Sequence, residues 1–299
     1  MFLVFTVKWQ LTRRFLYFPR IHNLNLRKYF SGFKQKPYKK FMCKDDSVSF
    51  VRVIARLDIK GDNVIKGIHL EGLRVVGQPD DLAQKYYKQG ADELIYMDAV
   101  ASLYERNNIL PIVKKAAQNI FIPMTVGGGI RNLENIREVL RHGADKVAVN
   151  TAAVNQPKFI NDAANMFGSQ CIVLSVEAIR REQGMWEVLV DNGREPTGRN
   201  VFDWVEEAEE RGVGEILVTS VDAEGTEDGF DIELTNAIAT KVKVPIIASG
   251  GAGEPKHIHS LIEQTDINAF ACASILHYNK YSLLDLKLAL NDCGLSVRL

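Results

Sequence analysis

The sequence has few cysteines and no apolar run long enough to span a bilayer. Its four cysteines in 299 residues lie far apart, without a C-x-x-C pair or a neighbouring histidine spacing typical of zinc sites. Cys171 and Cys272 stand inside apolar runs. We therefore expect both to be small buried side chains with free thiols, in a reducing compartment. No apolar stretch approaches the roughly 18 residues that a membrane span requires. We therefore expect a cytoplasmic protein without a metal, a cofactor or a membrane span.

Acidic residues are absent from residues 1–41, which contain ten Lys and Arg. Because the whole chain has 37 basic and 37 acidic residues, the remainder has 27 basic and 37 acidic, a net charge of −10. Such an acidic body argues against a nucleic-acid partner. The N-terminal stretch also lacks the apolar centre and cleavage site of a secretory signal. We interpret residues 1–48 as a basic extension, either disordered or a mis-assigned start upstream of Met42; a transit peptide or membrane-surface helix is the alternative.

From residue 49 to residue 299, short apolar runs alternate with amphipathic segments. Strands are expected at residues 51–58, 94–98, 122–126, 146–150, 171–177, 215–219, 244–249 and 269–273. Helices are expected at residues 79–89, 105–118, 133–141, 156–166, 201–210, 231–240, 255–263 and 282–291. Nearly continuous apolar strands indicate a parallel sheet covered by helices. Eight such units in about 250 residues predict an α/β fold of the closed (β/α)8, or TIM, barrel type.

The barrel sequence repeats itself at an offset of 119 to 123 residues. The strand that ends at Asp58 matches the strand that ends at Glu177, and Asn150 aligns with Ala273. Two further matches, in the second and third strands of each half, follow in the same order. This order indicates two half-barrels of four βα units each, with strands one and five on opposite sides of the barrel axis.

Glycine-rich turns follow the third and seventh strands, and short polar motifs follow the fourth and eighth. The residues of the two resulting sites are Gly128, Gly129, Asn150 and Thr151 in one half, and Gly250, Gly251, Ala273 and Ser274 in the other. Glycines allow backbone N–H groups to approach an anion closely, and this end of a barrel commonly binds phosphate. One such turn is often just a tight loop. Two at pseudo-symmetric positions indicate a long ligand with a phosphate at each end.

Two carboxylates and a lysine stand near these turns. Asp58 and Glu177 end the first and fifth strands, so both should project into the barrel mouth. Facing carboxylates can act as general acid and general base, although a helix cap or salt bridge is the alternative. Lys66, in the loop after the first strand, could stabilise negative charge or help a lid close, or simply be solvated.

Four charged residues stand at strand starts, at the opposite end of the barrel. They are Arg52, Glu93, Lys146 and Glu215, on the first, second, fourth and sixth strands. They could form surface ion pairs of little energetic value. They could equally form a ring of two cations and two anions across the barrel floor. The sequence does not choose between these arrangements.

Several motifs resemble the cyclase subunit of imidazole glycerol phosphate synthase. They include Arg-Leu-Asp58-Ile-Lys, Thr-Val-Gly-Gly-Gly129-Ile, Asn150-Thr-Ala-Ala153, Val-Asp222…Gly225-Thr226 and Ala-Ser-Gly-Gly-Ala-Gly253, and the resemblance covers residues 51–298. It implies a glutaminase partner that docks on the barrel floor and releases ammonia. The ammonia would pass through the barrel to a bis-phosphorylated ribulosyl-formimino carboxamide ribotide, which is cyclised and cleaved in histidine biosynthesis.

The resemblance also implies residue roles. Asp58 would be one catalytic carboxylate, and the four charged residues at the strand starts would form the ammonia gate. One phosphate would bind at Gly128, Asn150 and Thr151, and the other at Gly225, Thr226, Gly251 and Ser274.

Three residues depart from the family pattern. Glu177 and Glu224 stand where the family usually has Asp, and Arg56 replaces a small residue. A guanidinium at this position could recruit another anion or lower the pKa of Asp58 by about 1–3 units. The changes resemble paralogues from surface-polysaccharide gene sets, in which ammonia amidinates a sugar. A sugar-directed amidotransferase subunit, a ribotide isomerase and a non-catalytic glutaminase activator are thus alternatives to the cyclase.

Overall fold

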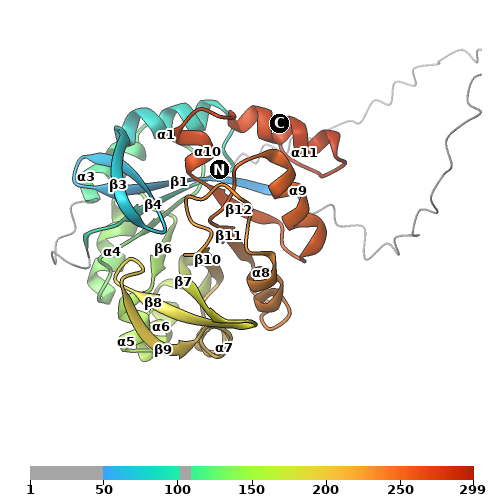
Figure 1. Cartoon of the computed structure of the whole chain (residues 1–299). Helices are drawn as coiled ribbons and strands as arrows, with labels where there is room; N and C mark the ends of the chain where they lie inside the picture. The colour runs from blue at the N-terminus through green and yellow to red at the C-terminus, as the bar shows by residue number, and fades with distance from the viewer. Residues whose placement is uncertain (1–49, 102–108) are drawn as a thin grey trace, which may run out of the picture. The chain divides into compact units, whose positions relative to one another are not determined.

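The computed structural model describes residues 50–101 and 109–299. The basic extension predicted for residues 1–48 lies outside this range, and so does the beginning of the helix predicted at 105–118. In the described part, eight parallel strands close into a barrel with helices on its outside (Figure 1). In order around the barrel they are β1 (Arg52–Lys60), β4 (Glu93–Asp98), β5 (Met124–Gly127), β6 (Lys146–Val149), β7 (Ile172–Glu182), β10 (Glu215–Ser220), β11 (Ile246–Ser249) and β12 (Ala269–Cys272). Pairing of β12 with β1 closes the ring, which confirms the predicted (β/α)8 barrel.

Helices follow the barrel strands close to the predicted positions. They are α1 (Pro79–Lys88), α3 (Leu110–Ala116), α4 (Leu133–Arg141), α6 (Lys158–Phe167), α7 (Val201–Arg211), α8 (Ile232–Ala239), α9 (Pro255–Gln264) and α11 (Leu283–Asp292). Several begin at a side-chain cap: Asn132, Asn200 and Asp231 each accept hydrogen bonds from backbone N–H groups of the first turn. Two short helices, α5 (Thr151–Asn155) and α10 (Ser274–His277), begin directly at the barrel rim.

Two β-hairpins extend beyond the barrel, one from each half. One is built from β2 (Asn63–Ile68) and β3 (Glu71–Gly77), the other from β8 (Met185–Val190) and β9 (Glu195–Asn200). β1 and β7 continue past the rim to pair antiparallel with β2 and β8. The expectation that Asp58 and Glu177 end their strands was therefore wrong. Both stand where the strands leave the barrel, because parallel pairing stops at Ile59 and Ala178 while hairpin pairing continues.

Apolar side chains fill two separate layers. The larger layer lies between the strands and the surrounding helices. The smaller one fills the inside of the barrel and comprises Ile54, Ile95, Met97, Ala148, Val173, Leu217, Ile247, Ala269 and Ala271. Because successive strand residues face opposite sides, strands that are buried on both faces read as continuous apolar runs. This explains why the strands could be recognised in the sequence.

Candidate active site

The floor of the barrel is closed by a ring of four charged side chains. Arg52 donates to Glu93 Oε1 at 2.6 Å and to Glu215 Oε1 at 2.7 Å. Lys146 Nζ completes the ring at 3.1 Å from Glu93 Oε2 and 2.7 Å from Glu215 Oε2. The two acids are buried, while the cations keep about a fifth of their side-chain surface exposed. Of the two arrangements left open by the sequence, the structure shows the ring.

Above this ring the barrel interior is apolar. Ile54, Ile95 and Leu217 are inaccessible to solvent, and Ala148 and Ala271 add small side chains to the same cluster. A neutral molecule such as ammonia can cross such a layer at far lower cost than an ion, because charge is strongly disfavoured in an apolar environment. The ring and the cluster thus lie in series below the mouth of the barrel.

At the mouth, Asp58 is paired with Arg56. Arg56 Nε donates to Asp58 Oδ1 at 2.8 Å, and both side chains are buried. Burial acts to raise the pKa of Asp58, but the positive charges of Arg56 and Lys66 outweigh it and hold that pKa below its ordinary value. Asp58 is consequently an anion at neutral pH.

Glu177 has a different environment on the opposite side of the mouth. Its Oε2 accepts a hydrogen bond from Gly193 N at 2.7 Å and one from Asn150 Nδ2 at 3.1 Å. Burial is the largest influence and raises the pKa of Glu177 to about 7, although Arg56 and the Gly193 N–H oppose this. Glu177 can therefore both hold and release a proton near neutral pH.

Lys66 lies on strand β2 and is buried, so the interpretation of a loop residue was wrong. Its Nζ forms an ion pair with Glu224, which is equally buried. Burial lowers the pKa of Lys66 to about 8, while the nearby Asp58 acts in the opposite direction. The hairpin thus places Lys66 over the mouth, near Asp58.

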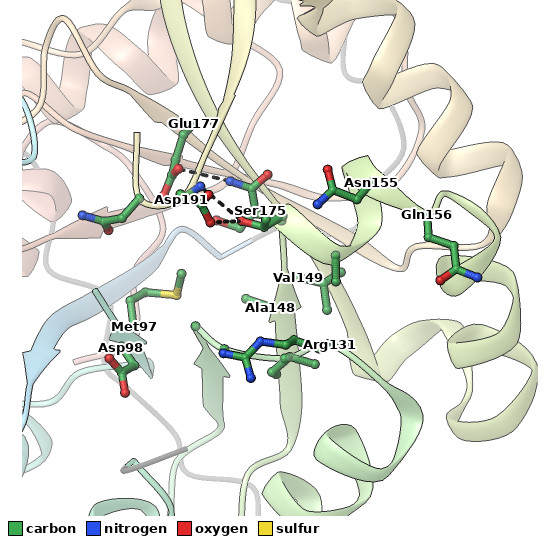
Figure 2. A pocket seen from close by; sticks show the side chains of 17 residues that line it. Met97, Asp98, Arg131, Ala148, Val149, Asn155, Gln156, Ser175, Glu177 and Asp191 are labelled. Carbon is green, nitrogen blue, oxygen red and sulfur yellow. Dashed lines mark hydrogen bonds between the residues drawn. The ribbon is translucent and has the colours of Figure 1, made fainter. Parts of the chain in front are cut away.

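A cavity of about 440 Å³ opens at the first predicted phosphate site. Gly128, Gly129, Asn150 and Thr151 all line it, together with Glu177. Figure 2 shows Glu177, Ser175 and Asp191 together on one side of this cavity, and Met97, Asp98 and Arg131 on the other. The Arg131 side chain donates to the carbonyl of Ala101 at 2.7 Å, which holds the cation beside the glycine turn.

The second predicted phosphate site is far smaller, with a cavity of about 10 Å³. The predicted Gly225, Gly250, Gly251, Ala273 and Ser274 line it, as do Glu224 and Glu227. Each of these two acids has a lysine partner, Lys66 for Glu224 and Lys280 for Glu227. The adjoining Thr226 donates its hydroxyl to the carbonyl of Ala223 at 2.9 Å.

Several residues of the site were not singled out in the sequence. Arg131 lies two residues after Gly129, so its closeness to the glycine motif could have indicated it. Asp191 lies at the tip of the β8–β9 hairpin, where the Asp-Asn-Gly sequence is a recognisable turn signal. Ser175 and His277 had no comparable signal. His277 is buried, its Nδ1 contacts Tyr86 at 2.7 Å, and burial lowers its pKa to about 4.

The described part of the chain has neither a metal-binding cluster nor a membrane-spanning helix. Within residues 50–101 and 109–299, no group of three or more His, Cys, Asp and Glu side chains is placed to hold a metal ion. Nor does any helix in these ranges have the length and apolarity to cross a membrane.

The amino-acid sequence of the chain is similar to those of known proteins. The "Histidine biosynthesis protein" family matches residues 52–282. The imidazole glycerol phosphate synthase subunit HisF of Legionella pneumophila is 61% identical over 207 residues, which are 69% of this chain and 98% of the relative. The HisF subunits of Trichormus variabilis and Streptococcus sanguinis are each 46% identical, over 83% of this chain and 98% of their own lengths.

Proposed function

The chain belongs to the HisF family of histidine biosynthesis proteins, and we propose that it is the cyclase subunit of an imidazole glycerol phosphate synthase. In this proposal, ammonia passes through the barrel and reacts with a bis-phosphorylated ribotide at the mouth. One observation carries the proposal: a floor ring, an apolar interior and two buried carboxylates stand in series in one barrel.

The substrate would be held by its two phosphates. The first-half site offers the backbone of the Gly128 turn, the start of α5 at Thr151, and the cation of Arg131. A phosphate here would gain charge-assisted hydrogen bonds, which are stronger than neutral ones. The second phosphate would bind at the turn of Gly251 and at the start of α10, at Ser274. The reacting part of the ribotide would then lie between the two carboxylates.

The two carboxylates would share the proton transfers. Closing an imidazole ring and expelling a carboxamide product requires one proton to be donated and another to be removed. Asp58, held as an anion, suits the base, and Glu177, with a pKa of about 7, suits the acid. Lys66, close to Asp58 at the mouth, would stabilise negative charge that develops on the substrate.

The partner would be a glutaminase subunit that docks on the floor and delivers ammonia to the ring. The cations of the ring reach the surface there, with a fifth of each side chain exposed. Substitution Lys146→Met should lower glutamine-dependent turnover of the complex more than turnover with ammonia added to the solution. Equal losses in both assays would contradict the gate. We place the complex in the cytoplasm, where free thiols such as those of Cys171 and Cys272 stay reduced.

The direct test has two substrates. Purified chain with ammonia and the ribotide should produce imidazole glycerol phosphate, and the gene should rescue a histidine auxotroph that lacks the cyclase subunit. The second candidate is a subunit that amidinates a sugar, which Arg56 and the longer Glu177 and Glu224 in the mouth favour. Amidination of a sugar acceptor, without ribotide turnover and without rescue, would select that candidate instead.

A further inference from the structure

The side chain of Arg56 crosses the inside of the barrel. It starts on β1, and its NH1 donates to Thr219 Oγ1 on β10 at 2.8 Å and to Ser249 Oγ on β11 at 3.2 Å. Strand β12 lies between β1 and β11, and its interior side chains are only the methyl groups of Ala269 and Ala271. Arg56 is 2% exposed. The guanidinium therefore fills the upper interior on the side of β10, β11 and β12.

The other side of the interior is open. The cavity of about 440 Å³ reaches from the mouth down to Met97, Ala148 and Ser175, on β4, β6 and β7. Glu177 lines this cavity, whereas Arg56 and Asp58 are not among the described residues that do. A small molecule that leaves the interior, or a substrate that enters from the mouth, therefore meets Glu177 on the open side.

We propose that Arg56 is a positioning residue that keeps Asp58 ionised as the proton acceptor and leaves Glu177, on the open side of the mouth, as the proton donor to the reacting molecule. This inference deepens the proposed function of the mouth and rests on it. It is carried by the three hydrogen bonds of Arg56 and by the cavity that opens at one carboxyl only.

The charges that face Asp58 agree with this division. Arg56 approaches from the same strand, Lys66 from β2 and His277 from α10. His277 is mostly neutral near pH 7, because burial lowers its pKa. The two remaining cations outweigh the cost of burial, so the pKa of Asp58 is lowered.

The groups around Glu177 give the opposite result. Arg56 and Asp58 act on it from β1 with opposite signs, and Asp191 adds a negative charge from the β8–β9 turn. Asn150 and the Gly193 N–H are its neutral hydrogen-bond partners. Burial therefore dominates, and the pKa of Glu177 is about 7.

The test is a titration of the two carboxyl groups in the full chain, without substrate. The protein is labelled with ¹³C at Asp and Glu side-chain carboxyls, and the signals are assigned with Asp58→Asn and Glu177→Gln. In the unsubstituted chain, Glu177 should titrate near pH 7 and Asp58 below its ordinary range. Substitution Arg56→Met removes the cation at similar length and should raise the Asp58 midpoint by about 1–3 pH units. Arg56→Lys keeps the charge, so its Asp58 midpoint should stay close to that of the unsubstituted chain.

The pH profile of ammonia-dependent turnover gives the second measurement. In Arg56→Met, the acidic limb of the profile should shift to higher pH by the same amount as the Asp58 midpoint. In Arg56→Lys, it should lie close to its position in the unsubstituted chain. If Arg56→Met does not fold, Thr219→Val and Ser249→Ala loosen the guanidinium without removing its charge, and each should raise the Asp58 midpoint by less than full removal of the charge would.

The outcomes separate this inference from the proposed function. Unchanged Asp58 titration in folded Arg56→Met, or in both loosened variants, would overturn the role of Arg56. So would a chain in which Asp58, not Glu177, titrates near pH 7. Titrations as expected in a chain that never turns over the ribotide would instead overturn the proposed reaction and leave the carboxyl assignment standing.

Discussion

The first half of the barrel, β1 to β6, and the second half, β7 to β12, build their glycine turns in the same way. Gly128 has φ +91° and Gly251 has φ +97°, values that favour glycine. A Cβ at Gly128 would lie 2.3 Å from the carbonyl oxygen of Asp98, and one at Gly251 would lie 1.9 Å from that of Gly229. Both turns therefore exclude any side chain, for the same steric reason.

The side chains around these turns differ. The first-half turn opens into about 440 Å³ beside the cation of Arg131. At the second-half turn only about 10 Å³ is free, and Glu224 and Glu227 line it. The carboxyls of the two halves differ as well, since Asp58 is held ionised and Glu177 is not. The halves thus share a backbone plan that repeats in the sequence, while their chemistry has diverged through single side chains.

The largest expected effect concerns Asp58. Substitution Asp58→Asn should lower ammonia-dependent turnover by about two to four orders of magnitude, which is the usual contribution of general acid–base catalysis. Substrate affinity, measured by calorimetry, should change little, because the phosphates hold the ribotide. Full turnover in Asp58→Asn would contradict the assignment of Asp58 as the general base.

The opposite environments of the two carboxyls should appear in stability as a function of pH. The folded-state pKa of Glu177, about 7, lies above the ordinary value of 4.5. The unfolded chain therefore loses this proton first. As a result, the free energy of unfolding falls by about 3 kcal/mol as pH rises from about 4.5 to about 7. In Glu177→Gln, the free energy of unfolding measured with urea should no longer show this decrease between pH 5 and pH 8.

Asp58→Asn serves as the matched variant in the stability experiment. Because the folded-state pKa of Asp58 is lowered, its charge stabilises the fold above the ordinary pKa of 3.8 and this contribution disappears as pH falls. Asp58→Asn should therefore destabilise the fold at neutral pH, opposite in sign to Glu177→Gln. The same pH dependence in both variants would contradict the difference between the halves.

A smaller effect is expected for phosphate binding. A crystal soaked in phosphate should show two anions, one at each glycine turn. Arg131→Met should lower the affinity for phosphate at the Gly128 turn by about tenfold or more, because a hydrogen bond to a charged group contributes about 1.5–3 kcal/mol. Lys256→Met, at an exposed lysine of α9, is the matched control and should leave both anions in place. No density near Gly128 or Gly251 would contradict the bis-phosphate proposal.

The smallest effect is expected for Glu177→Asp. If the glutamate is a conservative variant of the family acid, the shorter side chain should keep ribotide turnover within a few-fold or raise it. It would give up the contact with Gly193 N, now 2.7 Å from the carboxylate. If the longer side chain fits a sugar acceptor, Glu177→Asp should lower sugar amidination without creating ribotide turnover. Parallel assays on both substrates distinguish these results.

Much of the fold was predictable because its signals are local. Each barrel strand is a short apolar run and each helix an amphipathic segment, so all eight strands could be located. The hairpins were missed because residues 63–77 and 185–200 alternate only weakly in polarity and carry exposed charges. Lys66 was consequently assigned to a loop, although it is a buried strand residue.

The sequence by itself determined the closed barrel, its two-fold repeat and the two glycine turns, since these depend on residue type, periodicity and backbone conformation within short segments. Only the tertiary structure decided which charges meet. Arg52 and Glu215 are 163 residues apart in the chain, and Lys66 and Glu224 are 158 apart. Closure of the barrel brings such residues within hydrogen-bonding distance and shields them from solvent. Neither the partner of a charged residue nor its loss of solvent is encoded in its immediate sequence neighbours.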